Sequence, residues 1–279
     1  PNAERRTPNA ERRTPNAEPR TAFATLSPMP ELPDIAIYLE ALEKRVVEQP
    51  IERLRIGNPF VVRTISPPPS EVAGRRVVGL RRMGKRIVFV LAGELFIVVH
   101  LMIAGRLRWR EAGAAIPGKV GLAAFDFPSG TLIFTEAGSK RQASIHLVQG
   151  EPALAALDPQ GLEVLTADLP TFAARLGQEN HTLKRALTDP HIFSGIGNAY
   201  SDEILHAARL SPMKTVAALS EEEVGRVFEV GERGGGVSGG SGSGPGACRR
   251  AATAQSKRQA SSSCPFAAMP ASDCGPMAR

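Results

Sequence analysis

Cysteine is scarce in this sequence, and the little there is lies near the C-terminal end. Three of the 279 residues are cysteine: Cys248, Cys264 and Cys274. Three thiols cannot build a disulfide framework, and their spacing contains no C-x-x-C pair that would indicate a zinc site. Few cysteines and no pairing pattern suit a reducing cytosol.

Long apolar runs are missing as well. No segment approaches the roughly 20 apolar residues needed to span a bilayer, so no membrane partner is expected. The chain opens instead with three polar heptapeptides, PNAERRT, PNAERRT and PNAEPRT, which are not typical of a secretory signal. Each copy holds one small apolar residue, so stacked copies would bury almost nothing. We interpret residues 1–28 as a disordered extension, or as upstream sequence included by mistake, because the first methionine is Met29.

The middle of the chain has no excess charge of either sign. The formal net charge is +6, but residues 1–28 carry five arginines against three acids, and residues 231–279 carry six basic residues against two acids. Residues 29–230 are therefore neutral overall, and a nucleic-acid function has to be argued from local clusters.

One such cluster, the positive stripe, comprises the nine basic residues between positions 75 and 110. They are Arg75, Arg76, Arg81, Arg82, Lys85, Arg86, Arg106, Arg108 and Arg110. Only Glu94 opposes them, so the stripe predicts a positive face on a neutral body. The alternative is an ordinary solvated face of alternating strands.

The pattern of short segments predicts an α+β fold. Residues 34–49 have apolar residues at helical spacing. Eight β-rich runs follow, at 60–65, 75–80, 86–92, 95–101, 105–110, 121–127, 131–135 and 143–148. Many short strands favour an antiparallel β-sandwich. Helical segments then follow at 171–176, 182–187, 198–210 and 220–230, where Ser220 and Glu223 have capping-box spacing. We expect a sandwich domain over 29–150, a helical domain over 151–230 and a disordered Gly/Ser-rich tail over 231–279.

A glycine-rich turn precedes one of these helices. Gly195 and Gly197 allow tight turns, and Asn198 is a good cap for the helix that follows. The free N–H groups and positive end of such a helix favour an anion such as phosphate, and Lys184 and Arg185 lie nearby in sequence. A dinucleotide fingerprint is excluded because Tyr200 stands at the third glycine position and no strand precedes the turn. The alternative is simple helix capping.

Four motifs together carry a family resemblance. MPELPD at 29–34, GKR at 84–86, HLMIAGRLRW at 100–109 and GIGNAYSDEIL at 195–205 resemble, in order and spacing, the formamidopyrimidine-DNA glycosylase family. The resemblance covers about 29–230. It implies an N-terminal helix with a β-sandwich, then a helical domain with a helix-two-turn-helix motif. It also implies excision of oxidised bases from double-stranded DNA, followed by cleavage of the abasic site.

The resemblance assigns roles to individual residues. Pro30, once it is the first residue, offers a secondary amine that attacks C1′ and forms an iminium. Glu31 is the proton donor and acceptor beside it, and Lys85 holds a phosphate or sugar oxygen. Asn198 contacts phosphate at the helix start, and Ile103 fills the gap left by the extruded base.

Further DNA contacts are predicted for Arg82 and Arg106 of the positive stripe, and for Lys184 and Tyr200 beside the glycine-rich turn. Asp34 matches a family glutamate. Each motif residue also has a packing alternative: a helix-start proline, a first-turn carboxylate, an exposed lysine, a strand core residue.

Two departures from the family pattern bear on activity. Pro30 is internal in this sequence, and an amide nitrogen cannot act as the nucleophile, so we expect the native start at Met29. The paired cysteines of the family zinc finger are absent, so no metal or other cofactor is expected. The segment 135–144 also lacks the arginine and phenylalanine pair that the family inserts into DNA, which leaves the preference for the opposite base open.

Three functions remain in view: a DNA glycosylase and abasic-site lyase, a catalytically impaired damaged-DNA-binding protein, and a scaffold that touches no nucleic acid. The positive stripe argues against the scaffold. For the enzyme we expect oxidised purines as substrates, by analogy, a monomer, and a bacterial cytoplasmic location at the nucleoid.

Overall fold

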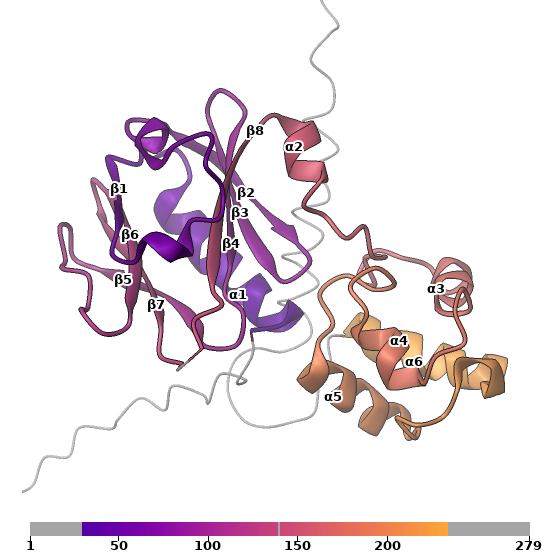
Figure 1. Cartoon of the computed structure of the whole chain (residues 1–279). Helices are drawn as coiled ribbons and strands as arrows, with labels where there is room; N and C mark the ends of the chain where they lie inside the picture. The colour runs from indigo at the N-terminus through magenta and orange to yellow at the C-terminus, as the bar shows by residue number, and fades with distance from the viewer. Residues whose placement is uncertain (1–29, 139, 234–279) are drawn as a thin grey trace, which may run out of the picture.

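The computed structural model describes residues 30–138 and 140–233. Disordered segments were expected at 1–28 and 231–279. Residues 231–233 instead form the end of the helix Glu221–Arg233, and the rest of both segments, with all three cysteines, lies outside the described residues. Figure 1 shows two lobes side by side: a β-sandwich and a group of helices. We call residues 30–150 the sandwich lobe and residues 157–233 the helical lobe. The predicted α+β architecture is confirmed.

Two four-stranded antiparallel sheets form the sandwich within the described residues, in the orders β1-β6-β7-β5 and β2-β3-β4-β8. The strands are β1 (Arg53–Ile56), β2 (Val77–Met83), β3 (Arg86–Leu91), β4 (Leu95–His100), β5 (Gly105–Arg110), β6 (Gly121–Phe127), β7 (Gly130–Glu136) and β8 (Ser144–Gln149). The inner faces of both sheets and one side of α1 (Leu32–Val46) share a single apolar core. Phe89 of β3 stacks on Phe125 of β6, with 5.7 Å between ring centroids, and so joins the two sheets.

The helical lobe contains α3 (Leu169–Leu176), α4 (Leu183–Thr188), α5 (Asn198–Ala208) and α6 (Glu221–Arg233), with a 3₁₀ turn η3 (Val216–Ala218). Its core is a second apolar cluster, in which Phe172 stacks on Phe193 at 4.7 Å. The capping box predicted for α6 is confirmed. The Ser220 N–H donates to the Glu223 carboxylate at 2.8 Å, and the Glu223 N–H donates to the Ser220 hydroxyl at 3.3 Å.

Leu32 ties the two lobes together. It is the first residue of α1, yet its side chain is fully buried in the core of the helical lobe, whereas the rest of the helix packs into the sandwich. Its N–H donates to the carbonyl of Gly195 at 3.0 Å. The chain segment that holds Pro30 and Glu31 is therefore fixed at the junction of the lobes.

The structure differs from the sequence prediction at residues 60–65, where a strand was expected. Residues Pro59–Val61 form a 3₁₀ turn, η1, and Val62 makes only an isolated bridge to Ile145 of β8. The Asn58 side chain caps this turn by accepting the Phe60 N–H at 3.1 Å, and Pro59 has no N–H to give to a sheet. A second 3₁₀ turn, η2 (Pro69–Val72), follows.

Two short elements were not predicted. Strand β1 pairs with β6, and helix α2 (Glu151–Ala155) packs Leu154 on the outer face of the β2-β3-β4-β8 sheet. In the ranges that the structure covers, no helix combines the length and the apolar character that crossing a bilayer requires.

Candidate active site and nucleic-acid interface

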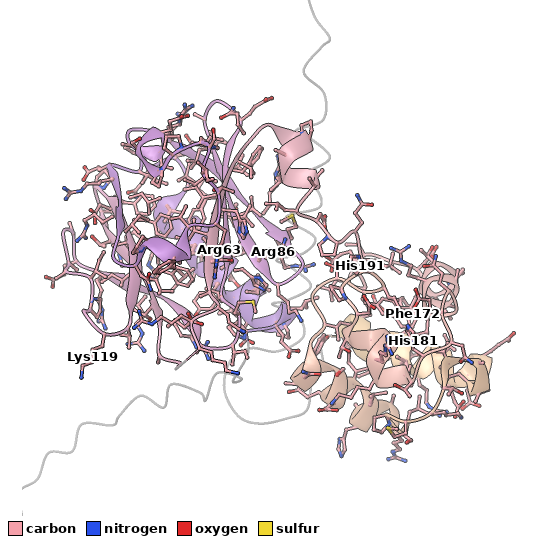
Figure 2. All side chains as sticks on the ribbon, viewed as in Figure 1. Arg63, Arg86, Lys119, Phe172, His181 and His191 are labelled. Carbon is pink, nitrogen blue, oxygen red and sulfur yellow. The ribbon has the colours of Figure 1, made fainter. Side chains whose placement is uncertain are left out.

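A pocket of about 270 Å³ lies at the junction of the lobes. The sandwich lobe lines it with Pro30, residues 83–86 of the β2–β3 turn, and His100, Met102 and Ile103 around the β4–β5 turn. The helical lobe adds Asp158, Pro159, Pro190, Ser194 and Gly195. Figure 2 shows Arg86 on the side of the sandwich that faces the helical lobe, with His191 across from it. Two predicted catalytic residues, Pro30 and Lys85, therefore share one pocket wall.

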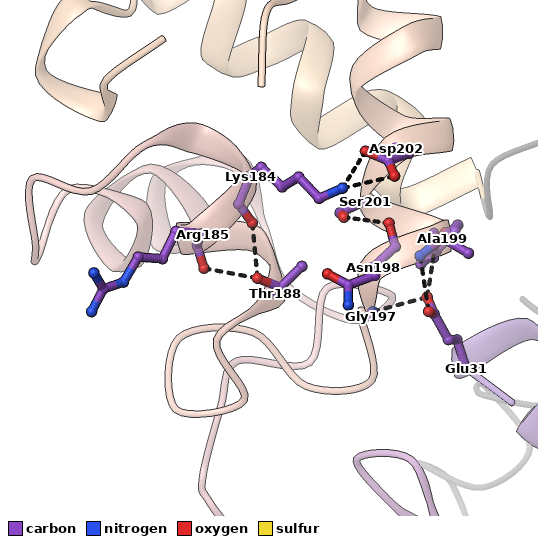
Figure 3. Close-up of polar contacts among 10 residues, drawn as sticks. Glu31, Lys184, Arg185, Thr188, Gly197, Asn198, Ala199, Ser201 and Asp202 are labelled. Atoms are coloured by element: carbon purple, nitrogen blue, oxygen red, sulfur yellow. Dashed lines mark hydrogen bonds and ion pairs between the residues drawn. The ribbon is translucent and has the colours of Figure 1, made fainter. Parts of the chain in front are cut away.

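Glu31, the third predicted catalytic residue, is buried beside this pocket, with an exposed fraction of 2%. Its carboxylate accepts three backbone hydrogen bonds from the start of α5: from Gly197 at 3.0 Å, from Ala199 at 3.0 Å and from Tyr200 at 2.8 Å. Figure 3 shows the Glu31 side chain reaching from the sandwich lobe to the N-terminal end of α5. Free N–H groups at a helix start and the positive end of the helix dipole together stabilise a carboxylate in this position. Glu31 therefore caps a helix of the other lobe.

The prediction that Asn198 caps this helix is wrong. The helix begins at Asn198, its N-cap residue is Gly197, and the Asn198 side chain is exposed. The carboxylate of Glu31 takes the position that a local cap would occupy. Three of the N–H groups that could have held a phosphate are thus already bound. A phosphate contact at Asn198 stays a prediction, and it would have to use the exposed side-chain amide.

The two glycines before α5 allow this close approach. A Cβ atom on Gly197 would lie 2.4 Å from the Glu31 carboxyl carbon and from Oε1. Gly195 has φ of +85°, which side chains other than glycine rarely adopt. The contact between the lobes therefore requires glycine at 197, and at 195 the positive φ of the turn requires it as well.

Replacing Gly197 with alanine is expected to destabilise the protein. The added methyl group would displace the Glu31 carboxylate and leave buried N–H groups without an acceptor, which costs about 2 kcal/mol of unfolding free energy. Urea denaturation measures this change. Gly225 of α6 is the matched control, because a Cβ there meets nothing within 4 Å, and alanine at a helix interior position stabilises by up to about 1 kcal/mol. Equal stability of Gly197→Ala and wild type would contradict the capping role of Glu31.

Positively charged groups of the β2–β3 turn point at carbonyls of the helical lobe. Lys85 Nζ donates to the carbonyl of Ile196 at 3.3 Å, and the Arg86 guanidinium donates to the carbonyl of Leu157. Burial lowers the pKa of Lys85, although the charge of Glu31 opposes the shift. Burial, with the charges of Arg86 and Lys85, also lowers the pKa of His100 to about 4. At neutral pH His100 is therefore an uncharged imidazole among cations.

Two further carboxylates lie close to Glu31. Asp34 accepts the Glu31 N–H at 3.1 Å, and burial raises the pKa of Asp34. Glu203 of α5 has its pKa raised by partial burial and then by the charges of Glu31 and Asp34. The positive charge of Arg106 works against this rise for Asp34, because it lowers the pKa of the Asp34 carboxyl. The surroundings of Pro30 thus combine carboxylates from both lobes with cations of the positive stripe.

The β4–β5 turn presents an apolar side chain at the pocket. Ile103 is 48% exposed and lines the pocket, so it is not a strand core residue. Met102 beside it has φ of +53°. Arg106 holds the turn by donating to the carbonyls of Ile103 at 3.1 Å and of Gly105 at 2.7 Å. An exposed apolar side chain on a fixed turn is what insertion into a base stack requires.

Three of the residues predicted to contact DNA are engaged within the protein. Lys184 Nζ donates to both carboxylate oxygens of Asp202, at 2.6 and 2.7 Å (Figure 3). The Tyr200 ring is buried in the core of the helical lobe, where its hydroxyl donates to the carbonyl of Gly231 at 2.9 Å. Arg82 is paired with Glu163. The structure thus gives Tyr200 a packing role, which differs from the DNA contact predicted for it.

Metal binding was not expected from the sequence. Among the residues placed by the structure, 30–138 and 140–233, no group of three His, Cys, Asp or Glu side chains is arranged to hold a metal ion. The three cysteines lie outside those ranges, so the expectation that they bind no zinc stays a prediction.

Family models match both lobes. The formamidopyrimidine-DNA glycosylase N-terminal domain matches residues 29–141, and the formamidopyrimidine-DNA glycosylase H2TH domain matches residues 157–232. The formamidopyrimidine-DNA glycosylase of Moorella thermoacetica is 33% identical over 214 residues, which cover 71% of this chain and 74% of the relative. The chain belongs to the formamidopyrimidine-DNA glycosylase family. The enzyme of that name from Chloroflexus aurantiacus is 31% identical over 211 residues, covering 72% of this chain and 73% of the relative.

Solved structures of formamidopyrimidine-DNA glycosylases share the arrangement of both lobes. MutM in complex with DNA that contains carbocyclic 8-oxo-G superimposes with a TM-score of 0.66 at 26% identity, covering 72% of this chain and 76% of MutM. The Lactococcus lactis Fpg in complex with DNA containing an abasic site gives a TM-score of 0.65 at 25% identity, covering 71% of this chain and 75% of that protein.

Several residues of the site were not singled out from the sequence. His100 and Met102 line the pocket, and Glu203 joins the carboxylates. His100 opens the motif HLMIAGRLRW and Glu203 lies inside GIGNAYSDEIL, so both motifs contained the signal. A single histidine or glutamate does not indicate a site by itself, and the sequence does not show which residues lie opposite each other at the junction of the lobes.

Proposed function

We propose that this chain excises oxidised bases from duplex DNA, oxidised purines above all, and then cleaves the strand at the abasic site. The observation that carries the proposal is that Pro30 and Lys85 line one pocket between the two lobes and that Glu31 is buried directly after Pro30, beside that pocket. The names of the relatives and the 8-oxo-G and abasic-site DNA of the similar structures support it. A DNA glycosylase needs a pocket of this kind because the target base must leave the stack.

The nucleophile in this proposal is the nitrogen of Pro30. As a free N-terminal secondary amine it has a pKa near 8, so a useful fraction is unprotonated at neutral pH. The nitrogen lone pair attacks C1′, the bond from C1′ to the base breaks, and the base leaves with that electron pair and takes up a proton. The nitrogen then loses its proton, and its lone pair breaks the bond from C1′ to the ring oxygen O4′, which takes up a proton as the sugar opens to the iminium. The iminium accepts electrons when a proton leaves C2′, which expels the 3′ phosphate oxygen and cuts the strand.

Glu31 is the group that moves protons in these steps. Its backbone adjoins Pro30, and three N–H donors from α5 fix the orientation of its carboxylate. A carboxyl group held this way can give a proton to the opening sugar and take one back. Capping and catalysis are compatible, because Oε1 accepts only the Ala199 N–H and keeps a lone pair, whereas Oε2 accepts from both Gly197 and Tyr200.

Lys85 and Arg86 supply positive charge where the DNA backbone enters the pocket. Among the described residues the Lys85 ammonium donates to one carbonyl, that of Ile196, and so keeps donors for a phosphate or sugar oxygen. Ile103 is the side chain that fills the space of the extruded base. Asn198, Arg106 and Lys184 stay predicted DNA contacts; Lys184 would have to exchange its bond to Asp202 for one to phosphate.

A second candidate function is damaged-DNA binding without turnover. The observation that favours it is the position of Pro30 after Met29 in this sequence, because the lone pair of an amide nitrogen is delocalised into the carbonyl and cannot attack C1′. The pocket and the positive stripe would still hold DNA. A monomeric state and a bacterial cytoplasmic location stay predictions for either function.

Duplexes with a single 8-oxoguanine test the two functions. We expect a chain that begins at Pro30 to release the oxidised base and to nick the strand without alkali, and to leave an undamaged duplex intact. Base release is followed by chromatography and nicking by denaturing gels. Salt-sensitive binding with neither product would support the binding function instead. Neither binding nor product would contradict both.

A further inference from the structure

An ion pair connects the two lobes directly behind the pocket. Arg82 of β2 donates through Nη2 to Glu163 Oε2, and through Nη1 to the carbonyl of Gly84 at 2.9 Å. Only 7% of the Arg82 side chain is exposed. The second carboxylate oxygen of Glu163, Oε1, is buried and makes no hydrogen bond with any residue that the structure describes. The Glu163 side chain is 33% exposed, so the charge withdrawn from water is mainly that of Arg82, and losing Glu163 would leave this buried guanidinium without its carboxylate partner.

The Arg82 guanidinium also supports the glycine-rich turn. A Cβ atom on Gly195 would lie 2.9 Å from Arg82 Nη1 and 2.9 Å from Leu32 Cδ1. The Gly195 backbone is therefore packed between an arginine of β2 and the first residue of α1. Its carbonyl also accepts the Leu32 N–H at 3.0 Å.

The contact between Arg82 and Gly195 is connected to the carboxylate of Glu31 through the backbone of residues 195–197. Gly195 is two residues from Gly197, whose N–H donates to Glu31, and Glu31 adjoins Pro30. A shift of the turn at Gly195 would move the first turn of α5, and with it the donors that orient Glu31. Displacements of about 1 Å at a distance from the chemistry can cost on the order of a hundredfold in rate.

We propose that Arg82 and Glu163 are positioning residues, which hold the start of α5 so that its N–H groups orient Glu31 toward Pro30. This inference rests on the proposed function, and it assigns Arg82 a role other than the DNA contact expected from its place in the positive stripe. The pair acts on the reaction through the helix, and neither residue touches the substrate.

Replacing Glu163 with glutamine distinguishes a positioning role of Arg82 from a direct contact of Arg82 with DNA. If Arg82 contacted phosphate, Glu163→Gln would free the guanidinium and remove a negative charge. DNA binding would then tighten, and its salt dependence would become steeper. If the pair positions α5, Glu163→Gln lowers the turnover rate and leaves both the affinity for DNA and its salt dependence unchanged.

The experiment compares variants of a chain that begins at Pro30, under single-turnover and steady-state conditions on an 8-oxoguanine duplex. For Glu163→Gln we expect kcat to fall at least about tenfold, with KM within about threefold of wild type and the same salt slope. Glu163→Asp keeps the charge and should recover part of the rate. Thermal unfolding confirms that each variant folds. Tighter binding with a steeper salt slope, or an unchanged kcat, would overturn the proposal.

A neighbouring ion pair provides the matched control. Arg81, one residue earlier on β2, donates to Glu151 Oε1 at 2.7 Å, and Glu151 is 53% exposed. Glu151→Gln likewise removes one carboxylate charge, from the partner of the adjacent arginine, but Glu151 is paired with neither Gly195 nor α5. We expect it to keep the kcat and KM of wild type, and a loss equal to that of Glu163→Gln would overturn the specific role of the pair formed by Arg82 and Glu163.

Amide hydrogen exchange tests the same inference without any enzyme activity. The N–H groups of Gly197, Ala199 and Tyr200 are protected by Glu31, so they should exchange at least about tenfold faster in Glu163→Gln, while amides later in α5 keep their rates. Glu151→Gln should change none of them. If wild type shows no base release and no nicking, the proposed function fails, and this exchange measurement still decides whether the pair positions α5. Unchanged exchange at all three amides would overturn the inference.

Discussion

Retaining Met29 in peptide linkage to Pro30 is expected to lower the rate of strand nicking at least about a thousandfold, relative to a chain that begins at Pro30. The reason is electronic: the lone pair of an amide nitrogen is delocalised into the carbonyl and cannot form the bond to C1′. The comparison uses the 279-residue chain and a chain that begins at Pro30 on one abasic duplex, with nicking followed on denaturing gels.

Two controls make this comparison specific. Pro30→Gly, in a chain that begins at residue 30, keeps an amine but loses the secondary amine and its ring, and should nick far more slowly than wild type. The rate of the wild-type chain should rise with pH toward about 8, because the unprotonated α-amino group is the nucleophile. Equal nicking by the blocked and unblocked chains would contradict a role for the Pro30 nitrogen.

Glu31→Gln is expected to lower base release by about two to four orders of magnitude, the usual contribution of a general acid–base group. A glutamine cannot give or take a proton at neutral pH. It also has one carbonyl oxygen to accept the N–H groups of Gly197, Ala199 and Tyr200, and its own amide hydrogens face those donors. Unfolding free energy should therefore fall by about 1–3 kcal/mol at the same time. Single-turnover base release and urea denaturation measure the two effects.

Glu40→Gln is the matched control for that substitution. Glu40 lies on the same helix, α1, but it is exposed, and its ion pair is with Lys44, at 4.0 Å. Surface pairs of this kind contribute about 0–1 kcal/mol, so we expect rate and stability to remain close to wild type. Comparable losses for Glu31→Gln and Glu40→Gln would contradict the special position of Glu31.

The β-sandwich was predictable from the sequence because its pattern is local. Seven of the eight runs expected as strands correspond to β2 through β8. Strand β1 was missed because it is four residues long and carries two arginines, RLRI. Residues 60–65 look like a strand by composition, but Pro59 and the Asn58 side chain turn the chain before any pairing starts.

The candidate active-site residues were predictable as motifs, whereas their contacts were not. Local sequence indicates Asn198 as the cap of α5, but the cap is Glu31, 166 residues earlier than Gly197. Lys184 looks like a free cation until Asp202, one helix further on, is placed next to it. Arg82 likewise looks like part of an exposed stripe until Glu163 covers it. In each case the partner comes from a distant part of the chain, which spacing along the sequence does not specify.

The positive stripe divides into parts with different surroundings. Arg82, Lys85 and Arg86 face the helical lobe and bond to it, whereas Arg108 and Arg110 of β5 are exposed. A count of charges therefore overstates how much of the stripe is available to DNA in this structure, and the junction between the lobes accounts for the difference.

Borohydride trapping on an abasic duplex tests the central claim most directly. Reduction of the iminium links enzyme to DNA permanently, and peptide mapping by mass spectrometry then locates the bond. The account predicts one adduct, at the nitrogen of Pro30, formed by the chain that begins there and absent from the chain that retains Met29. An adduct at Lys85 or another lysine, or efficient nicking with no adduct at Pro30, would contradict it.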